Sequence, residues 1–433
     1  MRGEGIKGQS YKKDNPTTLK QKGILIVMAH FYRRLIVHMA LIITLTPLMQ
    51  AQESITLGFV GDIMMHNTQL RRAWLGEDEN GVDQGYNFHP AFEWAKNNLA
   101  SPDLTIANFE TTLGGPNSAL VVDDRYGFRE YQAYPTFTTP DTLAQALSQA
   151  GIDVVSTANN HCLDSGIPGL ERTITILEEA NLHTVGTSKS GFPTPWRGRV
   201  QNLKISLLAW TASTNGLIFS KGMEQVNVFN ATGHDDRLED MLAEIRNEAS
   251  QDSDFVILLI HWGQEYMEEP DQYQKNLAQL AIEAGVDIII GSHPHTLQPI
   301  ERRIVERNGQ KEEVFIAWSL GNYISSQRYV KEERPWVDGS AMLQLQLEET
   351  HNHWRVSKAT FLPVYSHWTP DQIRVLPLHE ALNSKESPYP LSAYDQERIR
   401  ALDAWIPTQL TRYLGNIPAH SHSNGWTVQF PSP

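Results

Sequence analysis

Six short apolar runs in this chain are each followed by residues whose side chains can bind a metal ion, and this regularity restricts the fold more than any other feature. The runs are Ile55–Val60, Leu104–Ala107, Val154–Ala158, Phe255–Ile260, Val286–Ile290 and Val314–Leu320. Apolar runs bounded by glycine and polar residues predict buried strands. Ligands of open α/β sheets bind just beyond the carboxyl ends of the strands. If these strands share one sheet, the polar residues that follow them can meet at one edge.

Segments with helical periodicity alternate with these strands. They are Asp141–Ala150, Gly169–Asn181, Asp235–Ala249 and Asp271–Ala284. Such alternation indicates a layered α/β domain. Ser340–Leu347 and Trp354–Pro363 then predict the two strands of a hairpin, so antiparallel strands extend the sheet system and make it mixed.

The chain is expected to have three parts. They are an N-terminal extension over 1–51, the main domain over 54–363 and a C-terminal extension over 364–433. In the last part, Ala393–Leu414 predicts one amphipathic helix that is interrupted near Pro407, because proline cannot donate a backbone hydrogen bond. Gly415–Pro433 has few apolar residues in register and is expected to be a loose tail.

The N-terminal extension predicts export. Residues 28–34 contain two arginines, and Leu35–Leu48 is almost wholly apolar, as in a signal peptide with its cleavage point at Ala51. The apolar stretch is shorter than the roughly 20 residues of a bilayer-spanning helix. The mature protein is therefore expected in the periplasm or at the cell surface, with an uncleaved membrane anchor as the alternative. Translation starting at Met28 is also compatible with this pattern.

Composition excludes some functions. The net charge of -14 disfavours nucleic acid as a partner, since that needs a basic surface. Anionic substrates stay open, because a bound cation reverses the local field. Cys162 is the only cysteine, so no internal disulfide can form. A nucleophilic pair of Cys162 with His161 is disfavoured, since neighbours at a strand end point in different directions.

The first candidate ligands follow the first two runs. Asp62 and His66 come after one, and Glu110 after the other. Asp62 could instead cap a helix, and Glu110 could instead form a surface ion pair. Asn159, Asn160, His161 and Asp164 follow the third run, where a hydrogen-bonded turn is the alternative to a metal ligand with its supporting groups.

The strongest single motif is His293-Pro294-His295 after the fifth run. Proline restricts the residue before it to extended geometry, so both imidazoles are expected on one side of the chain. Neutral imidazoles suit Zn, Mn, Fe or Ni. His261 follows the fourth run, where a packed core histidine is the alternative, and Glu265 lies nearby. Asn322 follows the sixth run as a candidate supporting residue.

The order Gly-Asp, Asn-x-Glu, Asn-Asn-His, His-Trp-Gly, Gly-Ser-His-Pro-His and Ser-Leu-Gly-Asn resembles the CapA family of capsule synthesis proteins, over about residues 54–363. That family looks like a branch of the metallo-dependent phosphatase superfamily. The resemblance implies a layered α/β/β/α sandwich with mixed sheets and one or two divalent ions, with Mn, Fe or Zn expected. The implied ligands are Asp62, His66, Glu110, Asn160, His261, His293 and His295. Glu110 stands where the superfamily has a bridging aspartate, and the first spacer is longer.

The sequence leaves three functions open. The first is an exported metal-dependent hydrolase of a phosphoester or an amide in an anionic polymer, with His161 as general acid supported by Asn159 and Asp164. The second is a non-catalytic envelope component that binds such a polymer or a membrane-bound capsule synthase. The third is a nucleotidase that stacks a base on Tyr126, Tyr131 or Trp262. Oligomeric state is left open.

Overall fold

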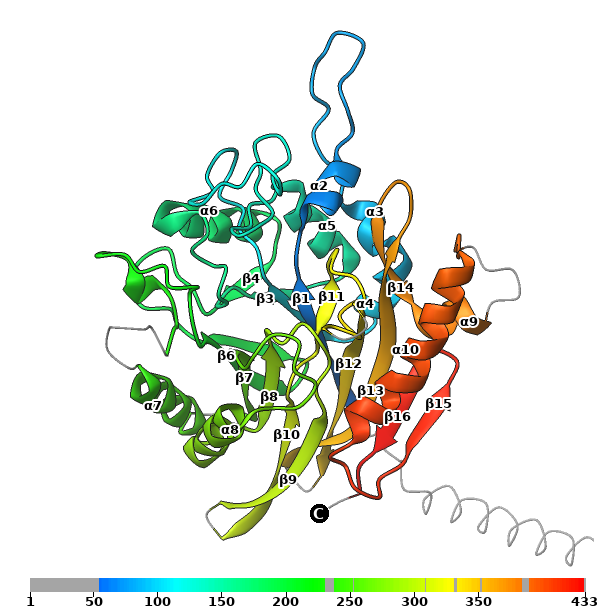
Figure 1. Ribbon diagram of the computed structural model, residues 1–433. Coiled ribbons are helices and arrows are strands. Elements are labelled where there is room, and N and C mark those ends of the chain that lie inside the picture. The colour runs from blue at the N-terminus through cyan, green and yellow to red at the C-terminus, as the bar shows by residue number, and fades with distance from the viewer. Residues whose placement is uncertain are drawn as a thin grey trace, which may run out of the picture. The chain divides into compact units, whose positions relative to one another are not determined.

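Two sheets lie face to face between layers of helices (Figure 1). The structure, a computed structural model, describes residues 54–431 except 230–236, 252, 308, 331–332, 351–352 and 384–388. The N-terminal extension and the start of the predicted helix at Asp235 lie outside the described residues.

The first sheet has the strand order β15-β16-β13-β12-β1-β2-β3-β4, with β11 paired to β1 and β14 to β13. Its strands are β1 (Ser54–Ile63), β2 (Leu104–Phe109), β3 (Val154–Ser156), β4 (His183–Val185), β11 (Asn322–Ile324), β12 (Gly339–Thr350), β13 (His353–Trp368), β14 (Ile373–Pro377), β15 (Ala419–His422) and β16 (Gly425–Gln429). The β1–β2 pair is parallel and the β1–β12 pair antiparallel, which confirms a mixed sheet.

The second sheet has the order β5-β6-β7-β8-β10-β9. Its strands are β5 (Trp196–Val200), β6 (Leu203–Thr211), β7 (Phe255–His261), β8 (Ile288–Ser292), β9 (Ile300–Arg307) and β10 (Gln310–Ala317). All six apolar runs thus contain strands, but these divide between two sheets, so a single sheet edge for all of them is wrong. Strand β7 is buried along its whole length and β6 at all but one residue, as expected for inner strands.

Most of the helices cover the outer faces of the sheets. The α-helices are α2 (Asn67–Ala73), α3 (His89–Phe92), α4 (Lys96–Leu99), α5 (Thr142–Ala150), α6 (Gly166–Glu179), α7 (Leu238–Ala249), α8 (Gln272–Ala284), α9 (Leu378–Asn383) and α10 (Ala393–Thr411). Helices α2 to α6 pack on one face of the first sheet, and α7 and α8 pack on the outer face of the second (Figure 1). A third apolar core fills the space between the sheets and includes buried residues of α9 and α10. This arrangement confirms the layered α/β/β/α sandwich.

The C-terminal part is more ordered than the sequence suggests. Helix α10 continues through Pro407, so the predicted interruption is wrong. Pro407 itself and the nearby Ile406 and Leu410 are buried, and this packing holds the helix in place. The loose tail is also wrong. Strand β16 pairs with β13, and Val428 and Phe430 are 0% and 2% exposed in the core between the sheets. The predicted domain boundary at residue 363 falls inside β13.

Candidate metal centre

The first sheet supplies the acidic side of the centre. Parallel pairing places Asp62 at the end of β1 beside Asn108 of β2 and Asn322 of β11. The register shifts at Gly61, a bulge that redirects the strand end. A Cβ at Gly61 would lie 1.9 Å from the carbonyl oxygen of Gly321, so only glycine permits this close approach.

The second sheet supplies the imidazoles. His261 ends β7 and pairs with Ser292 at the end of β8, and His293 and His295 follow directly. Their φ angles are 96° and 57°, so the extended geometry predicted for this pair is wrong. A non-glycine residue in this region is strained, and such strain gathers at functional sites. The turn that results brings the ring of His293 to 4.7 Å from that of His261 and 5.9 Å from that of His295, measured between ring centroids.

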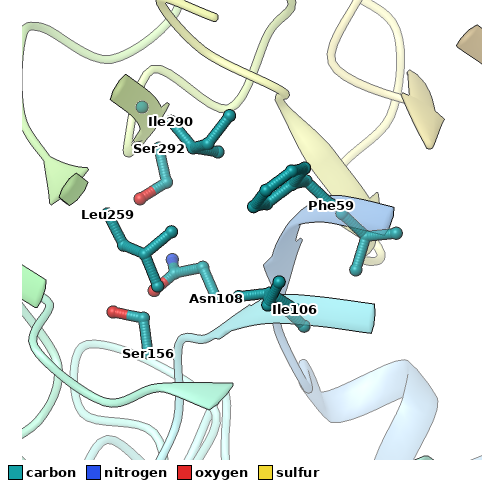
Figure 2. Close-up of a pocket in the computed structure, with 10 residues that line it drawn as sticks. Phe59, Ile106, Asn108, Ser156, Leu259, Ile290 and Ser292 are labelled. Atoms are coloured by element: carbon teal, nitrogen blue, oxygen red, sulfur yellow. The ribbon is translucent and has the colours of Figure 1, made fainter. Parts of the chain in front are cut away.

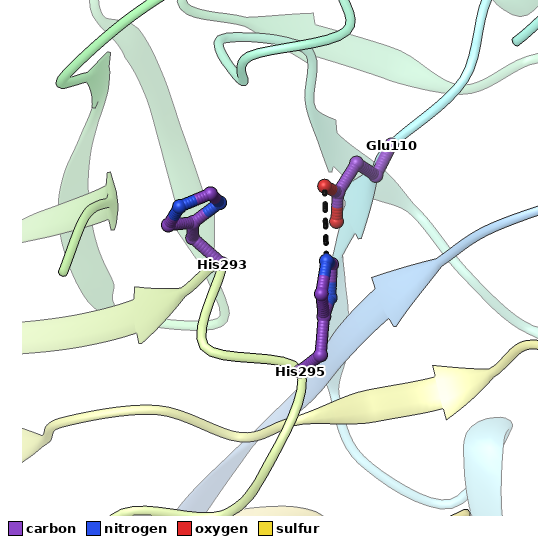
Figure 3. Close-up of side chains that lie close together, drawn as sticks. All are labelled: Glu110, His293 and His295. Carbon is purple, nitrogen blue, oxygen red and sulfur yellow. Dashed lines mark ion pairs between the residues drawn. The ribbon is translucent and has the colours of Figure 1, made fainter. Parts of the chain in front are cut away.

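The two sets of side chains meet between the sheets. Asp62 Oδ2 lies 3.0 Å from His295 Nδ1, and Glu110 Oε1 lies 3.5 Å from His261 Nε2. The same Glu110 oxygen lies 3.9 Å from His295 Nε2 (Figure 3). Asn160 Oδ1 lies 2.9 Å from His261 Nε2. Two groups each offer three ligand atoms within 4.8 Å of one another: Glu110 with His293 and His295, and Glu110 with Asp62 and His261. The structure therefore has residue groups that could hold a metal ion.

Unpartnered polar atoms show that a cation fits these residues. Both carboxylate oxygens of Glu110 are buried, and neither receives a hydrogen bond from the described part of the chain. His293 Nδ1 is in the same situation. A buried polar atom without a partner costs about 1–3 kcal/mol, and more when it is charged. A divalent cation would satisfy the carboxylate oxygens and the ring nitrogen together.

The protonation states match this reading. Burial, followed by the neighbouring imidazole of His293, lowers the pKa of His261 well below its usual value. Burial and then His295 lower the pKa of His293 to about 4. Both rings therefore stay neutral at physiological pH and keep a lone pair for a metal. Burial and then Asp62 raise the pKa of Glu110 well above the usual range, a penalty that a nearby cation would offset.

His66 is placed at the side of this centre. It precedes the first residue of α2, its Nδ1 lies 3.5 Å from the backbone nitrogen of Ser326, and its ring packs edge-on against Phe137. Burial and then His295 lower its pKa to about 3. His66 belongs to neither of the two ligand groups found among the described residues.

His161 and Asp164 form a buried pair. His161 Nδ1 lies 2.8 Å from Asp164 Oδ2, and Phe137 packs edge-on against the imidazole at 4.5 Å between ring centroids. The backbone nitrogen of Phe137 donates to the same Asp164 oxygen. Asn159 makes hydrogen bonds to the backbone. Its amide nitrogen donates to the carbonyl of Phe109, and its side-chain oxygen accepts from the backbone nitrogen of His161. Asn159 therefore shapes the turn that carries His161.

Glu265 and Asn322 surround the centre. Asn322 donates to Gln327 at 2.9 Å and to the Val337 carbonyl at 3.1 Å. Glu265 is exposed, and it contributes to the raised pKa of Glu110 after burial and Asp62. Neither is in a ligand group among the described residues.

Sequence reasoning missed three residues that support the centre. Asn108 donates to Asp62 at 2.8 Å and lies 3.3 Å from His261 Nδ1, and Ser292 Oγ lies 3.0 Å from the same ring nitrogen. Both precede a candidate ligand by one or two residues, a signal that was available. Phe137 lies in the irregular segment 114–138 and gave no signal, because its contacts with His66 and His161 are long-range.

The aromatic residues considered for base stacking pack against other aromatic rings. Trp262 is 0% exposed and stacks on Trp318, so its faces are not open to a ligand. Tyr131 packs edge-on against Tyr86, and Tyr126 is exposed beside Tyr134. The solitary Cys162 is buried, and burial raises its pKa to about 12, so it stays a thiol.

Two cavities adjoin the centre. A very small one, about 20 Å³, lies between the sheets beneath it, with Asn108, Ser156 and Ser292 facing apolar side chains (Figure 2). It has room for about one water molecule. A larger pocket of about 340 Å³ includes Asn160, His261 and His293 in its lining, together with Ser213, Gln264 and Tyr273. The larger pocket can therefore lead a substrate to the candidate ligands.

The fold and the centre define a layered α/β protein with carboxylate and imidazole groups gathered at its strand ends. Residues 56–327 match the family of bacterial capsule synthesis proteins PGA_cap, and the chain belongs to this family. It is 27% identical over 300 residues to the capsule biosynthesis protein CapA of Bacillus anthracis, covering 69% of this chain and 65% of that protein.

A second capsule protein and a solved structure are also similar to this chain. The PGA biosynthesis protein CapA of Bacillus subtilis is 26% identical over 302 residues, covering 69% of each chain. The match to the Bacillus anthracis protein spans just under two thirds of that protein's length. Among solved structures, the calcineurin-like phosphoesterase YfkN from Bacillus subtilis aligns with a TM-score of 0.41 and 14% identity, covering 72% of this chain and 90% of that one.

Proposed function

We propose that this protein is a divalent-metal-dependent hydrolase that cleaves a phosphoester or an amide bond of an anionic polymer during capsule synthesis. The observation that carries the proposal is Glu110, a fully buried carboxylate shared by both ligand groups, with neither oxygen hydrogen-bonded within the described residues. One or two ions of Mn, Fe or Zn suit this set of carboxylates and imidazoles. The family match supports the capsule context.

Each sheet has its own part in the chemistry. Asp62 and Glu110 bring negative charge from the first sheet, and His261, His293 and His295 bring neutral nitrogen ligands from the second. A bound divalent ion would lower the pKa of a water molecule towards about 7 and polarise the bond under attack.

His161 acts as the general acid that protonates the leaving group. Its Nδ1 is held by Asp164, so Nε2 is the atom that can donate to the departing oxygen or nitrogen. A general acid positioned in this way contributes roughly 10²–10⁴-fold. Asp164 acts through His161, because it fixes the ring orientation and is itself held by the backbone of Phe137.

Export and a membrane-bound partner complete the proposal. The basic residues before Leu35–Leu48 support translocation to the periplasm or the cell surface, by a cleaved or an uncleaved segment. Among the described residues, no helix has the length and apolar character needed to cross a bilayer. A capsule synthase in the membrane is the proposed partner, and its polymer is the proposed substrate.

Metal analysis and two substitutions test the proposal. The purified protein is expected to contain Mn, Fe or Zn and to hydrolyse a chromogenic phosphodiester or a γ-glutamyl oligomer. His293→Ala should lose both metal and activity, whereas His161→Ala should keep the metal and lose most of the activity. His89→Ala, at an exposed histidine of α3, is the matched control and should change neither. Metal without turnover of either substrate would indicate a polymer-binding envelope component instead, and absence of metal would refute the centre itself.

A further inference from the structure

A second group of polar residues borders the centre on the segment between β11 and β12. Ser326 approaches His66 through its backbone nitrogen, and Gln327 Nε2 donates to the hydroxyl of Tyr266 at 3.2 Å. Gln327 also accepts from Asn322 at 2.9 Å. The segment that follows β11 is thereby joined to the centre at several points, and it continues to Arg334.

Within the described part of the chain, Arg334 has one buried donor without an acceptor, although its side chain also interacts with the hydroxyl of Tyr266. Its Nε is buried and has no acceptor among the described residues, and no ion pair to it is found there. The guanidinium lies 5.8 Å from the ring centroid of Tyr266. The buried Arg398 makes a useful contrast, because it is paired with Asp338 at 2.5 Å. An unpaired buried donor is rare in native structures, and a missing ligand is one explanation for it.

Tyr266 connects this arginine to the centre. Its backbone nitrogen donates to Pro294, between the two histidines, at 2.7 Å, and its ring centroid lies 6.0 Å from that of His295. Its φ is 65°, a left-handed conformation that tyrosine rarely adopts. The ring of Tyr266 therefore lies beside the candidate ligand His295, and the guanidinium of Arg334 lies beside that ring.

We propose that Arg334 and Tyr266 bind a carboxylate of the polymer next to the bond under attack. The inference rests on the proposed function and adds two positioning residues to it. The planar guanidinium matches a carboxylate in two-point contact, and the phenol adds a third donor. Since the chain is strongly acidic overall, with a net charge of -14, an arginine without an ion pair among the described residues gives local attraction for an anionic substrate at this place.

Binding measurements on the manganese-loaded full chain test this inference. The probes are a γ-glutamyl tripeptide, the same peptide with its α-carboxylates converted to amides, and inorganic phosphate. Arg334→Gln is expected to weaken binding of the acidic tripeptide by about tenfold or more. It should hardly change binding of the amidated peptide, and the metal content should stay that of the wild type.

Arg328→Gln is the matched control. Arg328 carries the same charge on the same segment, but it is exposed and its guanidinium lies over Trp368 at 4.6 Å. Equal losses in the two variants, or equal losses for the acidic and amidated peptides, would overturn the inference. So would binding of phosphate alone, or no tripeptide binding by the wild type. Binding that depends on Arg334 without any hydrolysis would instead refute the hydrolase and leave the carboxylate site standing.

Discussion

Replacing Glu110 by glutamine should stabilise the metal-free protein and abolish its response to metal. The side chain is 0% exposed, and its two oxygens receive no hydrogen bond within the described residues. Asp62 adds a like charge beside it, which together with burial raises the pKa of Glu110. Glutamine keeps the shape, removes the charge and can donate to Asp62. The buried carboxylate is therefore a cost that only a cation offsets.

The expected size of the effect follows from these contacts. Relief of an unsatisfied buried group is worth about 1–3 kcal/mol, which for a chain of this length corresponds to a rise in Tm of about 1–4 °C. In the wild type, a metal ion at 100 times its Kd adds about 2.7 kcal/mol to stability. The two effects have opposite signs, so no general loss of folding can imitate the expected pattern.

Thermal unfolding with excess chelator and with excess Mn²⁺ measures both effects. Glu110→Gln should melt above the wild type in chelator and below it in Mn²⁺. Glu265→Gln is the control, because that acid is exposed near the same centre and should change Tm little in either condition. A lower Tm of Glu110→Gln in chelator, or a metal-induced rise equal to that of the wild type, would refute the reasoning.

Three further predictions concern other parts of the fold. Burial raises the pKa of Glu244 to about 7, although the hydrogen bond from Trp210 opposes the shift. Ionising this acid therefore costs the folded state nothing below the usual pKa of about 4.5, and the cost grows until the pH exceeds about 7. In urea unfolding, Glu244→Gln should be more stable than the wild type by up to about 3 kcal/mol at pH 8 and by almost nothing at pH 4.5. Phe430→Ala should lose about 3–5 kcal/mol in the same assay, whereas a truly loose tail would show no change. Gly61→Ala should reduce both stability and metal content, because the new methyl group would force β1 away from Gly321, and wild-type metal content would contradict that contact.

Local sequence patterns predicted where the strands of this fold lie better than they predicted which strands pair with each other. Each apolar run contains a strand, and the strand ends do carry Asp62, Glu110, His261 and the His293–His295 pair. The division of those strands between two sheets depends on pairing between distant segments, which periodicity does not encode. The C-terminal strand β16 was missed for the same reason, since it is short and is ordered by pairing with β13.

For the candidate site, too, the sequence predicted the residues better than their contacts. Residue type and position after a strand were enough to select most of the metal-binding groups. They were not enough to separate His66, which borders the centre, from His295, which faces Asp62. The geometry of His293 was also not predicted, because its left-handed backbone departs from the extended geometry that a following proline favours. Arg334 has no sequence signal, and only its unpaired buried nitrogen marks it.

The charge of the centre connects its metal content to its substrate. The two ligand groups contain two acids, Asp62 and Glu110, and their imidazoles at His261 and His293 are neutral because burial lowers their pKa values. One divalent ion would therefore balance the acids and leave the centre without net charge. A second ion would leave two positive charges, to which Arg334 adds a third nearby. Since an anionic polymer must be drawn to a protein of net charge -14, the two-ion state is the one that would attract it most strongly.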